Sequence, residues 1–529
     1  MLLSVRLCKS IFLLLLACVP CGFHAACGED AAVLIFEVDG AKQTRISPYI
    51  YGNNQPHWKS AGKLYTLTRI GGNRMTAYNW ENNASNAGSD WQHQSDNNLG
   101  GGDIAGEAMR TGVSAALAAG ASCIVTVPCA GFVAADKLGG GDVNKTPDYL
   151  NKRFCVSLPE KGAPFAYPPD LTDGKVYQDE FVWWLEKTFP GARTDARRTL
   201  FYDLDNEPDL WPETHKRIHP NKVSYDELAK LNIAYATAIK KVAPKALIFG
   251  FVSYGWNGFV SLQNAPDAHG RNFIDFYLQE MRKAEAAAGH RLVDVLDLHW
   301  YPEARGGGKR ITEDDAAPAV AAARIQAPRS LWDGSYTEKS WIADSIRQPI
   351  RLLPRVREQI EKQYPGTKLA LSEYYYGGGA DISGGLAEAD ALGIFGREGL
   401  FAACLWHTGR TDDRFIHAAF AMFRDYDGMS GAFGSMGLAV SGGDPACASV
   451  YASLDDARRV VVVAINKTAA ALPVKIVFKE CPQAGRASVY RLIAAKPAPS
   501  AEGELKIAAG GTIETELPAQ SVTTMVLAP

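Results

Sequence analysis

Two glutamates in this 529-residue chain each follow directly after a short apolar segment. Glu207 lies in 205–208 (DNEP), behind the segment 200–204, and Glu373 follows the segment 369–371. Cleavage of a glycosidic acetal uses two carboxyl groups, one that protonates the leaving oxygen and one that attacks carbon or activates water. A charged group next to an apolar strand must be paired, protonated or turned toward a cleft. Either glutamate alone could be a structural ion-pair partner, but the two together indicate acid–base chemistry.

The elements that must position these glutamates are eight short apolar segments that alternate with helical segments between about residues 48 and 430. The segments are 49–52, 67–70, 124–127, 200–204, 247–249, 293–298, 369–371 and 401–405. Continuous apolar strands separated by helices are typical of a parallel sheet that is covered on both faces. Eight such units favour a (β/α)8 barrel. Chemistry in that fold occurs at the carboxyl ends of the strands, so Glu207 and Glu373 are expected at one cleft.

The helical segments have recognisable boundaries. Ser224 and Glu227 form a capping box that opens a helix over 228–242. Further helices are expected over 272–287, 348–364 and 387–395. Pro354 is expected to break or kink the helix over 348–364, because proline lacks the backbone N–H of a helix interior.

The sequence changes character after about residue 430, where helical periodicity ends. Segments at 458–466, 474–478, 487–492 and 521–527 are strand-like and predict an antiparallel β-sandwich over 431–529. The segment 496–500 (KPAPS) is interpreted as a loop. The apolar segment 32–38 predicts a further strand, so residues 27–47 are assigned to a strand that joins the sandwich, and 48–430 to the barrel.

The first 26 residues predict export. Arg6 and Lys9 precede an apolar run over 11–19, which is signal-peptide length and too short to span a bilayer. The run 15–18 (LLAC) resembles a lipobox, so lipid anchoring through Cys18 remains an alternative to simple cleavage. We expect a secreted or periplasmic protein without a transmembrane segment.

Composition excludes other classes of partner. A net charge of −3 gives no sign of the basic surface that a nucleic-acid-binding protein needs. We expect the protein to be a monomer. None of the six cysteines beyond Cys27 forms a C-x-x-C pair, which leaves a zinc or redox site without support. Cys447 and Cys481 could form a disulfide or remain buried thiols.

Several long stretches are similar to one known family. They are 69–74 (RIGGNR), 205–211 (DNEPDLW), 297–303 (DLHWYPE), 364–373 (YPGTKLALSE) and 382–397. With them the chain resembles glycoside hydrolase family 44, the endo-β-1,4-glucanases and xyloglucanases of clan A. The resemblance implies a (β/α)8 barrel with a β-sandwich and a retaining mechanism, with Glu207 as acid/base and Glu373 as nucleophile.

The expected activity is therefore endo-acting hydrolysis of β-1,4-glucan backbones, in cellulose-type glucans or xyloglucan. A mannanase or xylanase of clan A would share the carboxylate pair and remains an alternative. A non-catalytic polysaccharide-binding protein is a second alternative. Such a protein would use aromatic residues to hold the sugar chain and would not need both carboxyl groups.

Further residues at predicted strand ends are candidate substrate contacts: Asn206, Arg69, Trp80, Trp211, His299, Tyr301, Trp406 and Asn53. The tryptophans could stack on pyranose rings, although core packing is the commoner fate of a single tryptophan. Asn206 could bond the sugar 2-hydroxyl, and Tyr301 could keep the nucleophile ionised. Arg69 could orient Glu373, bind substrate or form a simple salt bridge. His299 could contact a sugar hydroxyl or be structural, and Asn53 could line the cleft.

A structural calcium ion is the one metal considered. Glu81, Asp170 and Asp173 offer the hard oxygen ligands that Ca²⁺ prefers. Their spacing does not match an EF-hand loop, so a solvated acidic loop is the competing interpretation. Members of the resembled family can carry calcium near these positions. Catalysis itself is expected to need no cofactor.

Overall fold

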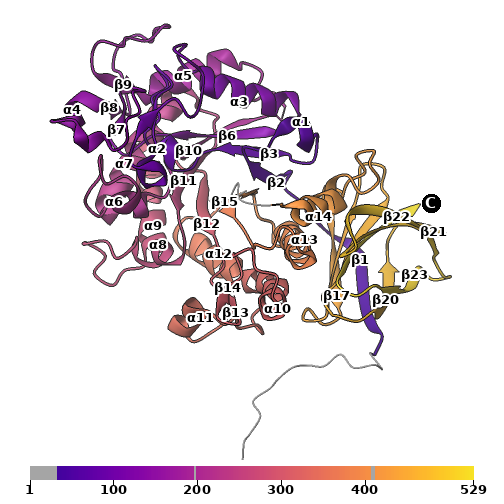
Figure 1. Cartoon of the computed structure of the whole chain (residues 1–529). Coiled ribbons are helices and arrows are strands. Elements are labelled where there is room, and N and C mark those ends of the chain that lie inside the picture. Colours follow the sequence, from indigo (N-terminus) through magenta and orange to yellow (C-terminus); the bar gives the residue numbers. More distant parts are fainter. Residues whose placement is uncertain (1–31, 196–197, 407–411, 529) are drawn as a thin grey trace, which may run out of the picture.

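The computed structural model describes residues 32–195, 198–406 and 412–528. A closed barrel of eight parallel strands lies beside a nine-stranded sheet (Figure 1). The barrel strands are β2 (Tyr49–Asn54), β3 (Leu67–Ile70), β6 (Ser122–Val127), β10 (Leu200–Leu204), β11 (Ile248–Ser253), β12 (Val295–Trp300), β15 (Lys368–Tyr374) and β16 (Ala402–Leu405). The predicted (β/α)8 barrel is confirmed, and each of the eight apolar segments is one of its strands.

The barrel is filled by side chains in layers. Every strand contributes to one apolar layer, made of Tyr49, Leu67, Ile124, Phe201, Phe249, Val295, Ala370, Ala402 and Cys404. Side chains alternate between the two faces of a strand, so the residues two positions further on also face the interior. On β3, β10 and β12 those residues are Arg69, Asp203 and Asp297, all fully buried. The barrel interior therefore changes from apolar to charged toward the carboxyl ends of the strands.

Helices surround the barrel. The longer ones are α3 (Glu107–Ala118), α5 (Gln178–Thr188), α7 (Tyr225–Val242), α9 (Phe273–Ala288), α10 (Pro318–Gln326), α12 (Leu352–Gln363), α13 (Ile382–Arg397) and α14 (Arg414–Arg424). The capping box of α7 is present, with Ser224 and Glu227 in the predicted roles. The kink expected at Pro354 is absent because α12 begins only at Leu352. Pro354 thus lies in the first turn, where backbone N–H groups have no intrahelical partner to lose.

Shorter elements form the loops at the barrel ends. The helices are α1 (Trp58–Ala61), α2 (Asn73–Thr76), α4 (Tyr149–Arg153), α6 (Trp211–Thr214), α8 (Trp256–Ser261) and α11 (Trp341–Ile346), with 3₁₀ turns η1 (Gly88–Trp91), η2 (Val143–Lys145), η3 (Pro208–Leu210) and η4 (Ala327–Leu331). The strands are β4 (Ser85–Asn86), β5 (Ser95–Asp96), β7 (Phe132–Ala134), β8 (Phe154–Leu158), β9 (Lys175–Tyr177), β13 (Arg305–Gly306) and β14 (Lys309–Arg310).

The second sheet contains β1 (Leu34–Arg45), β17 (Met436–Gly442), β18 (Ala448–Leu454), β19 (Val460–Asn466), β20 (Leu472–Lys479), β21 (Arg486–Ile493), β22 (Lys496–Lys506), β23 (Thr512–Leu517) and β24 (Ser521–Ala528). Their order is β22-β21-β24-β19-β18-β17-β1-β20-β23. The N-terminal strand β1 pairs with β17 in antiparallel and with β20 in parallel orientation. Ala487 of β21 and Ile513 of β23, near opposite ends of this order, share one apolar core. The sheet therefore folds over its own core, as a sandwich does.

The segment 496–500 is a strand and not the expected loop. It opens β22, which lies at the edge of the sheet and, among the described strands, pairs with β21 alone. An edge strand has one side without ladder hydrogen bonds, so prolines that lack an N–H are tolerated there. Pro497 and Pro499 pointed to a loop only because the sequence does not reveal which strand is an edge.

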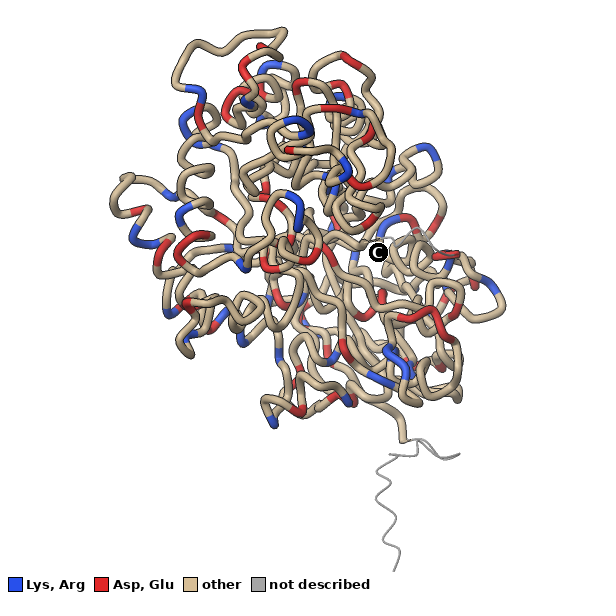
Figure 2. Tube along the Cα trace, turned by 60° about the vertical axis from the view of Figure 1, so that its left-hand side comes forward, with Lys and Arg blue, Asp and Glu red and all other residues tan. Residues whose placement is uncertain are grey.

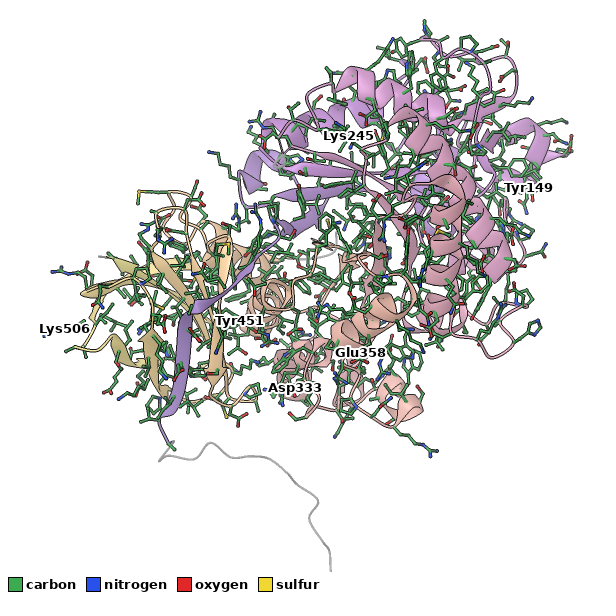
Figure 3. The ribbon with its side chains drawn as sticks, turned by 180° about the vertical axis from the view of Figure 1, so that it is seen from behind. Tyr149, Lys245, Asp333, Glu358, Tyr451 and Lys506 are labelled. Carbon is green, nitrogen blue, oxygen red and sulfur yellow. The ribbon has the colours of Figure 1, made fainter. Side chains whose placement is uncertain are left out.

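The sheet packs against the barrel through α13 and α14. Figure 3 labels Tyr451 of β18 where the sheet meets the barrel helices, and its hydroxyl donates to Asp390 Oδ1 of α13 at 2.7 Å. The ammonium group of Lys467 pairs with Asp390 Oδ2 at 2.7 Å, and both side chains are 1% exposed. A buried carboxylate that is shared by two partners fixes the orientation of α13 against the sheet.

Charged residues of both signs are interspersed over the molecule (Figure 2), in agreement with the small net charge. No helix within the described ranges has the length and apolar character needed to cross a bilayer. The predicted signal segment and Cys18 lie outside the described residues. Both cysteines are thiols and do not pair with each other. Cys447 is buried and donates to Asp444, whereas Cys481 is only partly buried and donates to the carbonyl of Val38.

Candidate active site

Glu207 is positioned by a sharp turn directly after β10. Asp205 and Glu207 both adopt left-handed backbone conformations, with φ of 70° and 44°. The Asp205 carboxylate holds the turn in place by accepting hydrogen bonds from Thr76 Oγ1 at 2.6 Å and from the Ala130 N–H at 3.1 Å. The Glu207 N–H donates to the carbonyl of Val252 at 2.9 Å. Such uncommon conformations persist only where surrounding contacts determine them, as they do here.

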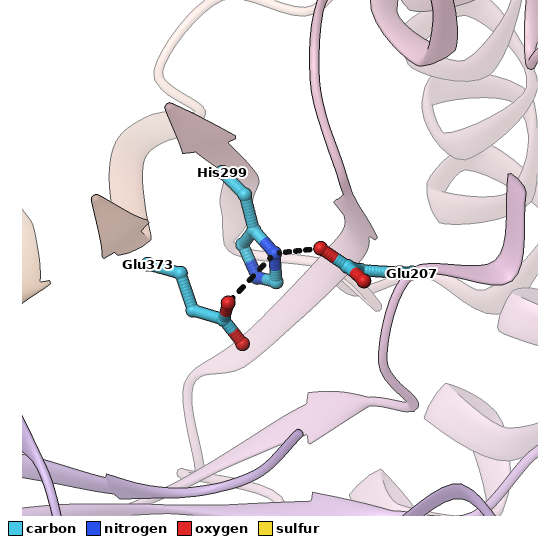
Figure 4. A group of neighbouring side chains, drawn as sticks. All are labelled: Glu207, His299 and Glu373. Atoms are coloured by element: carbon cyan, nitrogen blue, oxygen red, sulfur yellow. Dashed lines mark hydrogen bonds and ion pairs between the residues drawn. The ribbon is translucent and has the colours of Figure 1, made fainter. Parts of the chain in front are cut away.

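Glu373 belongs to β15, where it pairs in register with His299 of β12. His299 Nδ1 lies 2.9 Å from Glu207 Oε1 and 3.5 Å from Glu373 Oε2 (Figure 4). One oxygen of each glutamate and this nitrogen all lie within 4.8 Å of one another. The barrel thus brings together two carboxyl groups that are 166 positions apart in the sequence. This separation suits a reaction in which both groups act on one carbon atom.

Arg69 connects the buried charges below the two glutamates. Its Nε donates to Asp203 Oδ2 at 2.6 Å, its Nη1 to Glu373 Oε1 at 2.7 Å and its Nη2 to Asn206 Oδ1 at 2.9 Å. All three contacts use the planar fork of the guanidinium, which lysine could not reproduce. Because Arg69 is fully buried, it orients Glu373 and does not reach a bound substrate.

The surroundings of Glu373 act on its pKa in both directions. Burial and the neighbouring Glu207 raise the pKa of this carboxyl above its usual value, while His299, Arg69 and the Tyr301 hydroxyl act to lower it. The Tyr301 hydroxyl donates to Glu373 Oε2 at 2.7 Å. Two donors therefore hold the two oxygens of Glu373, which favours the ionised carboxylate. An ionised, oriented carboxylate is the state that a nucleophile needs.

Glu207 has a different environment. Burial raises its pKa to about 7, with Arg69 lowering it and Asp90 raising it. Burial also lowers the pKa of His299 to about 4, so the imidazole is neutral at neutral pH. The described hydrogen bonds of the Glu207 carboxyl comprise only the one with neutral His299, and its side chain is 15% exposed. Glu207 is therefore the carboxyl group suited to carry a proton near neutral pH.

Comparison with known proteins identifies the family. A sequence model of glycoside hydrolase family 44 matches residues 84–304. The solved structure of a Paenibacillus polymyxa xyloglucanase of this family superposes with a TM-score of 0.90 at 37% identity, covering 94% of this chain and 100% of that one. The chain belongs to glycoside hydrolase family 44.

Two curated relatives agree with this assignment. Endoglucanase A of Paenibacillus lautus is 44% identical over 433 residues, which are 79% of this chain and 61% of that protein. Beta-mannanase/endoglucanase A of Caldicellulosiruptor saccharolyticus is 40% identical over 482 residues, which are 85% of this chain and 35% of that protein. The chain thus spans less than two thirds of the length of either curated relative.

Two of the tryptophans expected to contact sugar are buried in the core instead. Trp80 is 0% exposed and its ring stacks on Phe181 and Trp184, at centroid distances of 5.9 Å each. Trp211 is also 0% exposed and packs against His219, 4.9 Å away. A ring enclosed by other side chains offers no face to a polymer. The expectation of substrate stacking was wrong for both, because their positions after strand ends do not reveal which way the loop turns.

The other predicted contacts differ in their access to the cleft. Trp406, directly after β16, is half-buried with its ring against Gly72, where an added Cβ would lie 2.7 Å from the ring. It keeps the exposure that a stacking residue needs. Tyr301 is likewise half-buried. Asn53 is 2% exposed and lies near Tyr65, so the expectation that it lines the cleft was wrong.

Asn206 and His299 lie beside the glutamates but are themselves enclosed. Asn206 is 2% exposed, and its Nδ2 donates to Asn73 Oδ1 at 3.2 Å. His299 is 0% exposed, and its contacts are with the two glutamates. These residues act on the carboxyl groups, and any contact with a sugar hydroxyl remains a prediction.

The three acidic residues considered for calcium lie in one region. Glu81 is 4% exposed. Burial raises its pKa to about 8, and Asp173, Glu180 and Asp170 add to the effect. Asp170 and Asp173 are exposed, and each accepts a hydrogen bond from its own loop. Among the described residues, the group with three ligand atoms within 4.8 Å consists of Glu207, His299 and Glu373 and includes none of these carboxylates.

Asp203 and Asp209 support the residues around the two glutamates, and the sequence analysis missed both. Asp203 pairs with Arg69 in the barrel interior. Asp209 accepts a hydrogen bond from Ser253 Oγ at 2.6 Å and thereby joins the turn after Glu207 to the end of β11. For Asp203 the available signal was its place inside the apolar segment 200–204, because a charge in such a position requires a buried partner.

Proposed function

We propose that this chain is a retaining, endo-acting hydrolase of β-1,4-linked glucan backbones. The observation that carries the proposal is that one oxygen of Glu207 and one of Glu373 lie within 4.8 Å. Retaining enzymes separate their carboxyl groups by about 5–5.5 Å, and inverting enzymes by about 6.5–9.5 Å so that a water molecule fits between. The present spacing leaves no such room.

In the proposed first step, Glu207 protonates the glycosidic oxygen while Glu373 attacks the anomeric carbon. The bond to the leaving group breaks and a covalent glycosyl–enzyme forms through a Glu373 oxygen. In the second step, Glu207 removes a proton from water, and the water oxygen attacks the anomeric carbon. The bond between this carbon and Glu373 breaks, which frees the carboxylate and releases the sugar with its original configuration. Arg69 and Tyr301 hold the carboxylate that attacks, and neutral His299 keeps Glu207 in position through its Nδ1.

The substrate class is proposed from the named relatives. An endoglucanase, a xyloglucanase and a beta-mannanase/endoglucanase are among the similar proteins. A β-1,4-glucan is common to the first two names, and the third supports mannan as the second candidate. A non-catalytic binding protein is not favoured, because it would have no use for a second buried carboxylate held by Arg69 and Tyr301.

The deciding experiment has two measurements. Reducing-sugar release and viscosity on carboxymethyl-cellulose, xyloglucan, mannan and xylan test the substrate and the endo mode, because internal cleavage lowers viscosity early. Activity on mannan alone would overturn the glucan assignment. Proton NMR of the first product tests retention, and Glu373→Gly with added azide should give a glycosyl azide of inverted configuration. Absence of azide rescue would contradict Glu373 as the nucleophile.

We also propose a structural calcium ion at Glu81, Asp170 and Asp173. Glu81 is a buried acid whose acidic neighbours raise its pKa, and a hard divalent cation would offset their repulsion. Catalysis requires no chemistry from this ion. Calcium should raise the melting temperature of chelator-treated protein, and Glu81→Gln should abolish that increase. The control Asp344→Asn, at an exposed position, should keep the increase. An equal increase in both variants would refute the site.

We further propose that the protein is exported and that it is a monomer. The apolar run 11–19 behind Arg6 and Lys9 supports an exported protein, and lipid attachment at Cys18 is the alternative to simple cleavage. N-terminal sequencing and intact mass of the exported protein distinguish cleavage near residue 26 from lipidation at Cys18. Sedimentation equilibrium measures the molecular mass in solution and so tests whether the protein is a monomer.

A further inference from the structure

A groove of about 600 Å³ lies on the outside of the barrel, between α3, α5 and the loop that contains Phe165 and Tyr167. Its aromatic residues are Phe165, Tyr167 and Trp183, with Trp184 beneath them. Glu107, Arg110 and Lys187 supply charge of both signs along it. Glu207 follows β10, and His299 and Glu373 lie near the ends of β12 and β15. None of these three residues lines the groove.

Tyr167 is the outermost member of a row of stacked rings. Trp80 stacks on Trp184 at 5.9 Å and an interplanar angle of 29°, and Trp184 stacks on Tyr167 at 6.3 Å and 19°. Exposure rises along the row from 0% at Trp80 through 7% at Trp184 to 48% at Tyr167. The inner face of Tyr167 is therefore covered, while nearly half of its surface faces solvent.

The row is held rigidly. Gly106 approaches Trp184 so closely that an added Cβ would lie 2.3 Å from the indole ring. The Tyr167 hydroxyl donates to the carbonyl of Ala105 at 3.3 Å. The flat face of Tyr167 is thus fixed before any ligand arrives, which reduces the entropy lost on binding.

The second aromatic residue is Trp183, which is half-buried. Its ring lies 5.5 Å from that of Phe165, and the ammonium group of Lys187 lies over one of its faces, 4.4 Å from the centroid. At the other side of the groove, Arg110 donates to Glu107 through Nε at 2.6 Å and through Nη2 at 2.5 Å. Flat apolar faces and groups that donate or accept hydrogen bonds therefore alternate within one groove.

We propose that this groove is a second binding site for the polysaccharide, separate from the catalytic cleft and occupied by a β-linked glucan chain. A pyranose ring with equatorial hydroxyls has two apolar C–H faces and a polar edge, which matches ring platforms bordered by charged hydrogen-bonding groups. The inference rests on the proposed function for the identity of the polymer. A second contact on the same chain raises the local concentration of substrate at the cleft.

The test uses Tyr167→Ala and Trp183→Ala in a Glu373→Gln background, so that the polymer is not cut. Native gels that contain xyloglucan or hydroxyethyl-cellulose measure polymer affinity. Loss of one stacking contact should weaken it about fivefold. Trp341→Ala is the matched control, because Trp341 is 41% exposed but lies outside the groove. Unchanged melting temperatures establish that each variant is folded.

Catalysis gives an independent measurement. With Glu373 intact, Tyr167→Ala should leave kcat/KM on a short chromogenic cello-oligosaccharide unchanged and lower activity on dilute polymer. If the Tyr167→Ala and Trp183→Ala variants are retarded in the polymer-containing gels as strongly as the Trp341→Ala control, the second site is overturned and the proposed hydrolase is unaffected. Tyr167-dependent retardation without hydrolysis of any β-glucan would instead overturn the proposed function alone. A dimer in sedimentation that Tyr167→Ala abolishes would assign the groove to self-association and also overturn the inference.

Discussion

Replacing Tyr301 by phenylalanine removes the hydrogen bond that its hydroxyl donates to Glu373 Oε2 at 2.7 Å. Hydrogen bonds to charged groups contribute about 1.5–3 kcal/mol. One pKa unit corresponds to about 1.4 kcal/mol. Since the bond favours the ionised carboxylate, its loss should raise the pKa of Glu373 by about one to two units. Arg69 still pairs with Oε1, so the carboxyl group keeps its position.

The sign of the effect follows from the role of Glu373. The nucleophile must be ionised, so the acidic limb of the kcat/KM profile reports its protonation in the free enzyme. A higher pKa of Glu373 moves the acidic limb toward neutral pH, so the enzyme is active over a narrower pH range that begins at a higher pH. The two glutamates interact, so the limb reports the titration of the pair.

The assay is kcat/KM against pH on a soluble chromogenic cello-oligosaccharide, for the wild type and Tyr301→Phe. Tyr225→Phe is a matched control, because the Tyr225 hydroxyl donates to the backbone carbonyls of Val260 and Arg271, away from the glutamates. The control should keep the wild-type limbs. An acidic limb that stays in place in Tyr301→Phe, at unchanged melting temperature, would refute the proposed stabilisation of Glu373.

Three further predictions concern the same site. Glu207→Gln should lower turnover by about 10²–10⁴-fold, the usual contribution of a general acid, and Glu373→Gln by at least as much; near-wild-type hydrolysis by either folded variant would contradict its role. Because the pKa of Glu207 is about 7 and the acid must be protonated, wild-type kcat/KM should fall as pH rises through about 7; a flat alkaline profile up to pH 9 would disagree. Arg69→Met should lower the free energy of unfolding, measured by urea denaturation, by about 3–5 kcal/mol, because it leaves Asp203 buried without its cation. An unchanged free energy of unfolding would show that the contacts of Arg69 add nothing to stability.

The barrel was predictable because its signal is local. A parallel strand covered on both faces is a continuous apolar run, and each of the eight runs became one strand. Glu207 and Glu373 were predictable for the same reason, since each interrupts the pattern where a strand ends. Pro354 and the prolines of β22 were misread because their tolerance depends on where a helix begins and on which strand lies at an edge.

The sequence by itself determined the succession of strands and helices and the two carboxyl groups, because periodicity and strand ends are properties of neighbouring residues. Only the tertiary structure decided that His299 lies between the two glutamates. It also decided that Trp80 and Trp211 are enclosed while Tyr167 reaches the surface. Distances between strands and exposure of side chains depend on how distant segments pack, and no window of sequence contains that information.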